Sequence, residues 1–175
     1  PEESAHCIRV LRLGMGEKVQ VIDGEGGYYN AVITIPDAKQ CKLTITETIK
    51  KKTKHDYSVH IAIAPTKNMD RFEWFIEKSV EIGVDEITPI ICRNTEKPGI
   101  KKERINNLII SAMKQSLKST RTILNSACPI NDFLNTDVKG TCMIAHCNET
   151  FDRKKISDVY SKNETAIILI GPEGD

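Results

Sequence analysis

The sequence lacks the features that mark several large classes of protein. No apolar run approaches the roughly 18 residues of a membrane-spanning helix, so no transmembrane segment is expected. The 25 Lys and Arg balance 24 Asp and Glu, and the formal net charge is +1. This excludes a generic polycation but leaves room for a local basic stripe that binds nucleic acid. Motifs of the GxGxxG and GxxxxGK[ST] types are absent, so the common pyrophosphate sites have no support.

The six cysteines form no CxxC pair. Their tightest group is Cys142, His146 and Cys147, which lacks a fourth ligand and the spacing of a zinc knuckle. Cys41 and Cys92 fall in apolar, strand-like runs, where a free cysteine acts as a small hydrophobe. We therefore expect no metal centre, and we interpret the cysteines as reduced thiols of a cytosolic protein.

The 175 residues are enough for one large domain or two small ones. A hydrophobic content of 39% and a mean hydropathy of −0.32 are typical of a soluble globular protein. The chain opens with Pro1 in place of Met, so we expect that it is trimmed at this end. Absence of a leader sequence therefore excludes little.

Residues 1–52 are predicted to form a short helix followed by a small, barrel-like antiparallel β module. Apolar alternation marks three short strands, within 17–23, 31–35 and 41–49. The glycine-rich stretch that begins at Asp23-Gly24 predicts a turn with positive φ. The lysine-rich residues 50–54 are typical of a linker.

Three potential cations recur at helical spacing in the first segment. His6, Arg9 and Arg12 are each three residues apart, which would place them on one exposed face of the helix. Such a stripe can contact phosphates, or it can be an ordinary solvated face.

Residues 53–175 are predicted to alternate strands and helices, which favours an α/β domain with a largely parallel sheet. A capping box at Asp70 and Glu73 would start the first helix, and Gly83 would end it. The predicted elements in order are a strand at 57–63, that helix, a strand at 87–91, a helix at 105–116, a strand at 141–145, a short helix at 153–159 and a strand at 165–170.

The last predicted strand runs directly into a glycine-rich loop, Gly171-Pro172-Glu173-Gly174-Asp175. Ligands of open α/β sheets bind beyond the carboxyl ends of the strands. Glycine lets backbone groups approach a ligand because no Cβ intervenes. The loop is therefore a candidate ligand site, with an ordinary loop as the alternative. Since a parallel strand needs a following element to cover it, we expect that Asp175 is a truncation point.

The chain resembles the SPOUT methyltransferases, and within them the 16S ribosomal RNA uridine-N3 methyltransferases. The resemblance is collinear over nearly the whole chain. The residues that carry it are His6-Cys7-Ile8-Arg9-Val10-Leu11-Arg12, Asp23-Gly24 with Gly26, Lys67, Met69, Arg71, Lys78, Glu81-Ile82-Gly83-Val84-Asp85, Ile87-Thr88-Pro89, Arg93, Ala112-Met113-Lys114-Gln115-Ser116 and Leu169-Ile170-Gly171-Pro172-Glu173-Gly174.

The resemblance implies a PUA-like β-barrel domain at 1–52, which helps to hold RNA, and a trefoil-knotted SPOUT domain at 53–175. It implies S-adenosylmethionine as the cofactor, with no metal, and 16S rRNA of the 30S subunit as the substrate. It also implies a cytoplasmic homodimer whose active sites lie at the subunit interface. The sequence departs from the family at Lys118, where an arginine is usual, and at Asp175, where a glycine is usual. The segment that completes the knot lies beyond Asp175, so the knot is incomplete in this chain.

Site residues follow from the resemblance and from their places in the predicted elements. Cofactor binding is assigned to Ala145, His146, Leu169, Ile170, Gly171, Pro172, Glu173 and Gly174, mainly through the backbone of the last six. The candidate catalytic residues are Lys67, Arg71, Glu81 and Gln115, with a salt bridge to Lys78 as the favoured alternative for Glu81. RNA binding is assigned to His6, Arg9, Arg12, Arg93 and Lys118.

Two other classes of protein compete with this interpretation. One is an RNA-binding protein without catalysis, which the presence of the glycine-rich loop disfavours. The other is a nucleotide-binding α/β enzyme such as a dehydrogenase or kinase, which the missing phosphate motifs disfavour. A thermal-shift screen with S-adenosylhomocysteine, NAD and ATP distinguishes the three classes.

Replacing Arg9 and Arg12 by alanine tests the basic stripe. If both contact phosphates, RNA affinity falls, and the slope of log Kd against log salt concentration flattens by about one per arginine. Cofactor affinity stays unchanged, as measured by calorimetry. Unchanged RNA binding would assign this helix a purely structural role.

Overall fold

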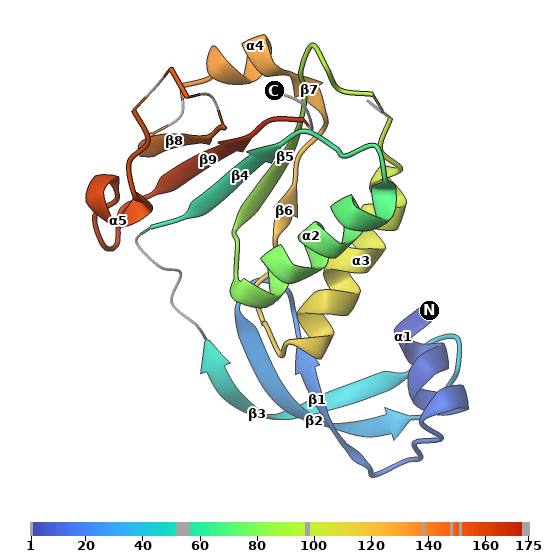
Figure 1. Ribbon diagram of the computed structural model, residues 1–175. Coiled ribbons are helices and arrows are strands. Elements are labelled where there is room, and N and C mark those ends of the chain that lie inside the picture. Colours follow the sequence, from blue (N-terminus) through green and yellow to red (C-terminus); the bar gives the residue numbers. More distant parts are fainter. Residues whose placement is uncertain are drawn as a thin grey trace. The chain divides into compact units, whose positions relative to one another are not determined.

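The structure is a computed structural model that describes residues 2–51, 57–96, 99–137, 139–147, 149–150 and 152–172 (Figure 1). The chain divides into two compact units, Pro1–Lys54 and His55–Asp175.

The first unit begins with the predicted short helix, but the basic stripe does not share one helical face. Helix α1 (Glu2–Ala5) continues into a π-helical turn, η1 (His6–Val10), in which Leu11 N–H donates to His6 C=O at 3.0 Å. Arg12 lies beyond the helix and has a left-handed φ of 56°. The prediction of a common face is therefore wrong, because the wider π turn and the left-handed residue break the three-residue spacing.

The strands of this unit form an antiparallel sheet in the order β1 (Lys18–Ile22), β2 (Gly27–Ile35) and β3 (Lys42–Lys51). The predicted turn is confirmed, since Gly24 and Gly26 have φ of 82° and 106°. Asp23 Oδ1 accepts hydrogen bonds from the N–H of Glu25 and Gly27, which lowers the pKa of its carboxyl. Ala31 and Ile33 are buried. The described strands leave the sheet open at β1 and β3, so they do not close the expected barrel by themselves.

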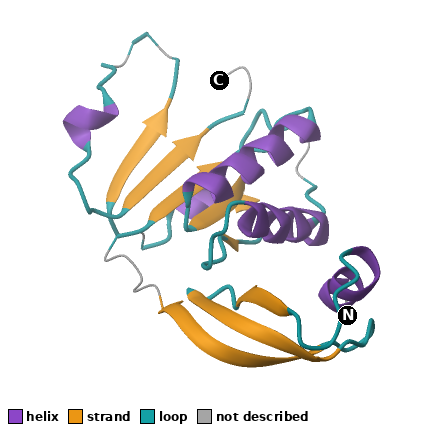
Figure 2. Cartoon of the chain, turned by 90° about the horizontal axis from the view of Figure 1, so that it is seen from below, coloured by secondary structure: helices purple, strands orange, loops and turns teal. Residues whose placement is uncertain are grey.

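The second unit contains a parallel sheet with the strand order β6-β5-β4-β9-β8, and β7 also pairs with β5 (Figures 1 and 2). The prediction of an α/β domain with a parallel sheet is confirmed. Its elements are β4 (Val59–Ile63), α2 (Met69–Ile82), β5 (Glu86–Ile91), α3 (Lys102–Gln115), β6 (Ile123–Leu124), β7 (Cys128–Pro129), α4 (Ile130–Leu134), β8 (Thr141–Ala145), α5 (Ile156–Val159) and β9 (Ala166–Ile170).

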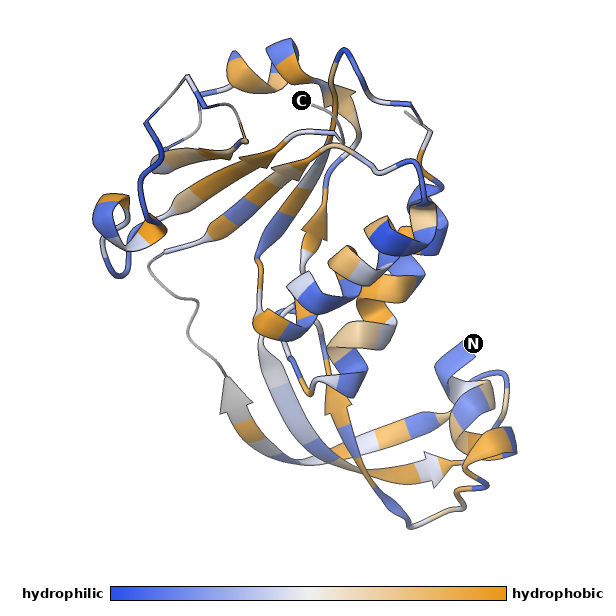
Figure 3. Ribbon diagram, in the orientation of Figure 1, coloured by the Kyte–Doolittle hydropathy of each residue, from blue (hydrophilic) through white to orange (hydrophobic). Residues whose placement is uncertain are grey.

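Apolar side chains of the strands form the core of this unit, and Figure 3 shows β9 coloured as hydrophobic over most of its length. One core cluster joins Phe133 of α4 to alternate residues of the central strands. Its other members are Ala62, Ala64, Ile90, Ile167 and Leu169. The alanines leave room for Phe133, and the helices α2 and α3 pack side by side.

Helix α2 begins one residue before the predicted capping box. Its N-cap is Asn68, whose side-chain oxygen accepts from Asp70 N–H at 2.9 Å. The capping-box prediction is wrong because Asn68 already supplies the acceptor that Asp70 would have provided. The predicted end is confirmed, since Gly83 is left-handed with φ of 94°.

The segment at 123–134 was not predicted as regular structure. The strands β6 and β7 have two residues each, too few to show an alternating pattern, and α4 has five. The predicted helix at 153–159 is confirmed only for Ile156–Val159.

A polar cluster lies inside the sheet near the amino ends of its strands. His60 is 8% exposed, and its Nε2 lies 2.7 Å from Thr88 Oγ1. Asn125 Nδ2 donates to the same hydroxyl at 2.7 Å, and Glu86 lies 3.8 Å from His60 Nδ1. The ring of Phe133 meets the imidazole edge-on at 5.4 Å. Burial lowers the pKa of His60, and Glu86 opposes this effect.

Removing the N-cap of α2 is expected to destabilise the second unit. Asn68→Ala leaves Asp70 N–H without its acceptor, so the free energy of unfolding falls by about 1 kcal/mol. Asn68→Asp keeps an acceptor oxygen and serves as the control. Urea unfolding followed by the fluorescence of Trp74, the single tryptophan, measures the difference. Equal stability of the two variants would contradict this role of Asn68.

His60 is expected to make stability depend on pH. Because its folded pKa is below the ordinary 6.5, the unfolded chain binds the proton first. Stability is therefore complete above about pH 6.5 and falls below it, by at most about 1.4 kcal/mol per pH unit. Thermal unfolding between pH 5 and 8 should show a shallower decline for His60→Gln than for the wild type. The exposed His6→Gln is the control, and parallel curves for all three proteins would contradict the prediction.

Candidate functional site

The parallel strands bring their carboxyl ends to one edge of the sheet, here called the carboxyl edge. The register aligns Ile63, Ile170 and Ala145 across β4, β9 and β8. Ala64 N–H donates to Ile170 C=O at 2.9 Å, so this row of hydrogen bonds continues past the end of β4. The segments that follow the three strands are neighbours, although they are far apart in the sequence.

The strand order reverses at β4 and β9. From β4 the chain moves to β5, β6 and β7 on one side, then crosses to β8, and β9 returns to lie between β8 and β4. This is a topological switch point, where open α/β sheets form a ligand-binding crevice outside the carboxyl ends of their strands. The glycine-rich loop predicted as a ligand site therefore begins at this switch point.

The residues that leave the carboxyl edge fit a cofactor held mainly by backbone groups. Gly171 follows β9 and has no Cβ, so its backbone can approach a ligand, whereas Ala64 beside it is 1% exposed and belongs to the core. His146, the residue after β8, and Pro172, the second residue after β9, are half-buried. Leu169 is only 7% exposed and belongs to the apolar core, so it supports the loop from below.

Part of the predicted cofactor set cannot be placed. Glu173 and Gly174 lie outside the described residues. Ala145 is exposed and aligned with Ile170, which itself is half-buried at the last position of β9.

Three predicted cationic residues follow the carboxyl ends of β4 and β5. Lys67 lies after β4 and forms an ion pair with Glu96 at 3.1 Å, with 70% and 58% of these side chains exposed. Arg71 is exposed in the first turn of α2, and its N–H donates to Asn68 C=O at 3.2 Å. Arg93 is exposed just after β5. Sequence and structure therefore agree in bringing positive charge to this edge.

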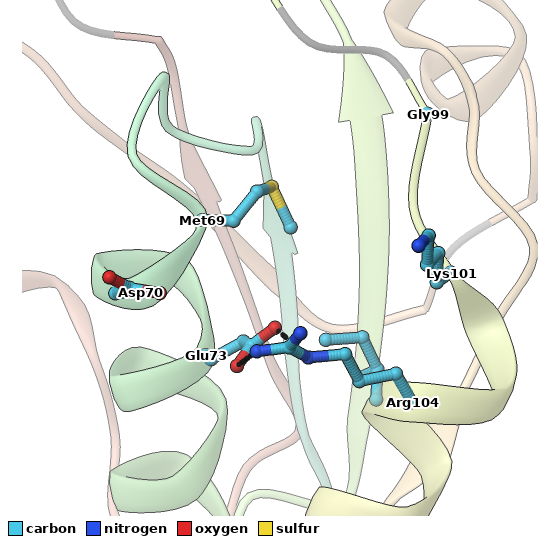
Figure 4. Close-up of a pocket in the computed structure, with 7 residues that line it drawn as sticks. Met69, Asp70, Glu73, Gly99, Lys101 and Arg104 are labelled. Carbon is cyan, nitrogen blue, oxygen red and sulfur yellow. Dashed lines mark hydrogen bonds and ion pairs between the residues drawn. The ribbon is translucent and has the colours of Figure 1, made fainter.

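A hollow of about 260 Å³ lies between the first turns of α2 and α3 (Figure 4). Arg104 spans it and forms an ion pair with Glu73 through two contacts. Nε lies 2.6 Å from Oε1, and Nη2 donates to Oε2 at 2.8 Å. The rest of its lining is Met69, Asp70, Gly99, Lys101 and Ile105. Local sequence spacing does not predict this pair, because its members are 31 residues apart on two helices.

The predicted catalytic residues do not form a single cluster within one chain. Glu81 lies near the end of α2, at the opposite edge of the sheet. This position follows because, just after the helix, Asp85 N–H donates to Val59 C=O at the start of β4, at 3.0 Å. Gln115 ends α3, and nearby Thr122 Oγ1 donates to Val84 C=O at 2.7 Å. Glu81 follows Arg71 by 10 residues of the same helix, roughly 15 Å along its axis, and Gln115 lies at the corresponding end of α3.

Glu81 and Lys118 have local contacts at that opposite edge. Glu81 accepts from Lys78 Nζ at 2.8 and 3.0 Å, which matches the salt-bridge alternative, and together with Glu77 it raises the pKa of Lys78. Lys118 Nζ lies close to Gly83, at the C-terminus of α2, where a cation interacts favourably with the helix dipole.

The remaining predictions concern the first unit, metals and the membrane. His6, Arg9 and Arg12 are exposed in the first unit. Within the described ranges, no group of three His, Cys, Asp or Glu side chains is placed to hold a metal ion. No helix among the described residues has the length and apolar character needed to cross a bilayer.

Comparisons with known proteins place the chain in a family. The model of an RNA methyltransferase domain matches residues 52–175, and the model of an RNA methyltransferase PUA domain matches residues 1–46. A curated relative from Rickettsia conorii, named ribosomal RNA small subunit methyltransferase E, is 27% identical over 99% of this chain and 70% of its own length.

Solved structures agree with these matches. A probable rRNA methyltransferase from Porphyromonas gingivalis has a TM-score of 0.90 and 38% identity, over 100% of this chain and 75% of that one. A putative methyltransferase from Legionella pneumophila, solved with the bound cofactor S-adenosylmethionine, has a TM-score of 0.82 and 26% identity, over 99% and 73%. The cofactor predicted from the sequence is the one bound in that relative. The chain belongs to the RNA methyltransferase family, and it carries the PUA domain of that family in its first unit.

Proposed function

We propose that this protein transfers a methyl group from S-adenosylmethionine to N3 of a specific uridine in 16S rRNA of the 30S subunit. The observation that carries the proposal is the glycine-containing strand end at the β4–β9 switch point, in a chain of the RNA methyltransferase family. The named relative from Rickettsia conorii and the cofactor in the Legionella pneumophila relative support it. An RNA target of this kind would be met in the cytoplasm.

The cofactor would be held at the carboxyl edge. Backbone groups from Ile170 to Gly174 would bind it on one side, with Ala145 and His146 forming a second wall and Leu169 supporting the loop. S-adenosylmethionine supplies an electrophilic methyl group on a sulfonium. At this edge Gly171 has no Cβ, and Ala145 is small and exposed, which leaves room for the adenosine and the positively charged sulfur of the cofactor.

The cationic residues of this edge would activate the base. N3 of uridine is a poor nucleophile while it carries its proton. The transfer forms an N3–CH₃ bond, breaks the S–CH₃ bond, and releases the N3 proton to solvent or a base. Lys67 and Arg71 would stabilise the negative charge that develops on the flanking carbonyl oxygens. The uridine must leave its stack or lie unpaired to reach the edge.

The placement of Glu81 and Gln115 supports a homodimer in which each active site is built from both subunits. In one chain Glu81 lies roughly 15 Å from Arg71 along α2, and Gln115 lies at the same end of α3, so both would reach the base in a partner's site. His6, Arg9, Arg12, Arg93 and Lys118 would contact RNA phosphates. Completion of the trefoil knot around the cofactor loop belongs to the same proposal.

Methyl transfer to 30S particles tests the proposal directly. The full-length protein is incubated with labelled S-adenosylmethionine and 30S particles from a strain that lacks the modification. The label should appear in 16S rRNA, and mass spectrometry of digested nucleosides should identify 3-methyluridine. No label in the RNA, or label on a carbon or a ribose oxygen, would overturn it.

The role of Arg71 is tested in the same assay. Arg71→Ala is expected to slow the transfer by about 100-fold, as loss of one transition-state donor does elsewhere. Lys162→Ala removes a charge from an exposed turn before β9 and should leave the rate within a factor of two. Equal rates for the two variants would exclude Arg71 from the chemistry.

A further inference from the structure

Positive charge is concentrated along α3 and the segment that follows it. Residues 99–121 contain one acid, Glu103, against six cations. Five of these are exposed and Lys118 is half-buried. The cations are Lys101, Lys102, Arg104, Lys114, Lys118 and Arg121. Since the whole chain has a formal net charge of only +1, this segment is far more basic than the rest.

Three of these cations are not neutralised by acids. Lys101, Lys102 and Arg121 have no carboxylate within ion-pair distance in the part of the chain that the structure describes. Lys102 Nζ donates instead to Ser126 Oγ at 3.3 Å, and Arg121 Nη2 donates to Asn106 Oδ1 at 2.8 Å. Both partners are neutral, so they orient the cations and leave their charge available.

Three other cations of this unit are paired with acids. Lys67 pairs with Glu96, and Lys78 pairs with Glu77 and Glu81. Arg104 pairs with Glu73. Unlike these cations, Lys101, Lys102 and Arg121 keep their charge unneutralised, and they lie in the segment where six cations face one acid.

These three cations line one side of α3 and begin at the carboxyl edge. Asn106 follows Lys102 by one helical turn, about 5–6 Å along the axis. Arg121 follows α3 in the chain, and its guanidinium reaches back to bind Asn106. Lys101 and Lys102 line an open hollow of about 560 Å³ together with Glu103, Arg104 and Asn107. Arg104 connects this end of α3 to the first turn of α2, which follows the carboxyl end of β4.

We propose that Lys101, Lys102 and Arg121, here called the α3 basic face, bind the phosphate backbone of the RNA substrate and guide the strand toward the carboxyl edge. The identity of this RNA rests on the proposed function. Binding would neutralise the face and release counterions from the RNA. A protein partner fits less well, because protein interfaces are depleted in lysine and α3 exposes no large apolar side chain that would anchor one.

Two triple variants with the same charge change test the α3 basic face. K101Q/K102Q/R121Q removes it, and K154Q/K155Q/K162Q removes three exposed lysines elsewhere in the same unit. Binding of a labelled 16S rRNA fragment is measured by fluorescence polarisation over a salt series, without cofactor. The first triple should weaken binding about 10-fold or more at low salt and reduce the salt slope by about two, since three phosphate contacts are lost. The second triple should change the affinity less than two-fold. Thermal unfolding verifies that both variants are folded.

Each outcome decides between the proposals. Equal salt slopes for the two triples would overturn the α3 basic face, even if the wild type methylates 30S particles. A wild type that binds RNA but transfers no methyl group would overturn the proposed function and leave the face intact. If the first triple binds RNA normally but no longer binds intact 30S particles, the face recognises a ribosomal protein and the proposal is wrong.

Discussion

The parallel pairing of β4 with β9 is the constraint on which the candidate site depends. The two strands are joined by register pairs from Val59 with Ala166 to Ile63 with Ile170, and the ladder continues with Ala64 N–H donating to Ile170 C=O. At the other end, Ser58 N–H donates to Thr165 Oγ1 across 107 residues of sequence. This pairing creates the reversal of strand order, and it fixes Gly171 beside Ala64. Without it, the loop after β9 would have no fixed neighbours and could not position a cofactor relative to Lys67 and Arg71.

Apolar packing stabilises this pairing, and the interior changes character along the strands. Toward the carboxyl edge, Ala62, Ala64, Ile90 and Leu169 pack with Phe133, and burial of such groups contributes about 25 cal/mol per Å² of apolar surface. Toward the amino edge, His60 and its partners Thr88 and Glu86 replace apolar contacts with hydrogen bonds. A buried imidazole is tolerated there because its Nε2 has a hydrogen-bond partner in Thr88. Its burial lowers the stability of the fold only at a pH at which the unfolded chain binds a proton that the folded chain does not.

The helices α2 and α3 connect the two edges, and this gives their ends different roles. Their first turns lie by the carboxyl edge, where Glu73 and Arg104 hold them together, and their last turns lie by the amino edge. A helix is a rigid spacer of about 1.5 Å per residue, so residues at its two ends cannot serve one small site in the same chain. A shared role of Arg71, Glu81 and Gln115 therefore belongs to the proposed homodimer.

The sequence alone determined the class of the fold and the place of the loop. Alternating apolar residues and the Gly83 terminator were enough to predict the parallel α/β unit, and the collinear motifs indicated the family that the comparisons then showed. The short strands and the N-cap at Asn68 escaped prediction, because two residues carry no period and several polar residues compete for one cap. Only the tertiary structure decided which strand lies beside β9, that Arg104 binds Glu73, and that Thr88 binds His60. Such contacts join residues far apart in the chain, and local spacing contains no information about them.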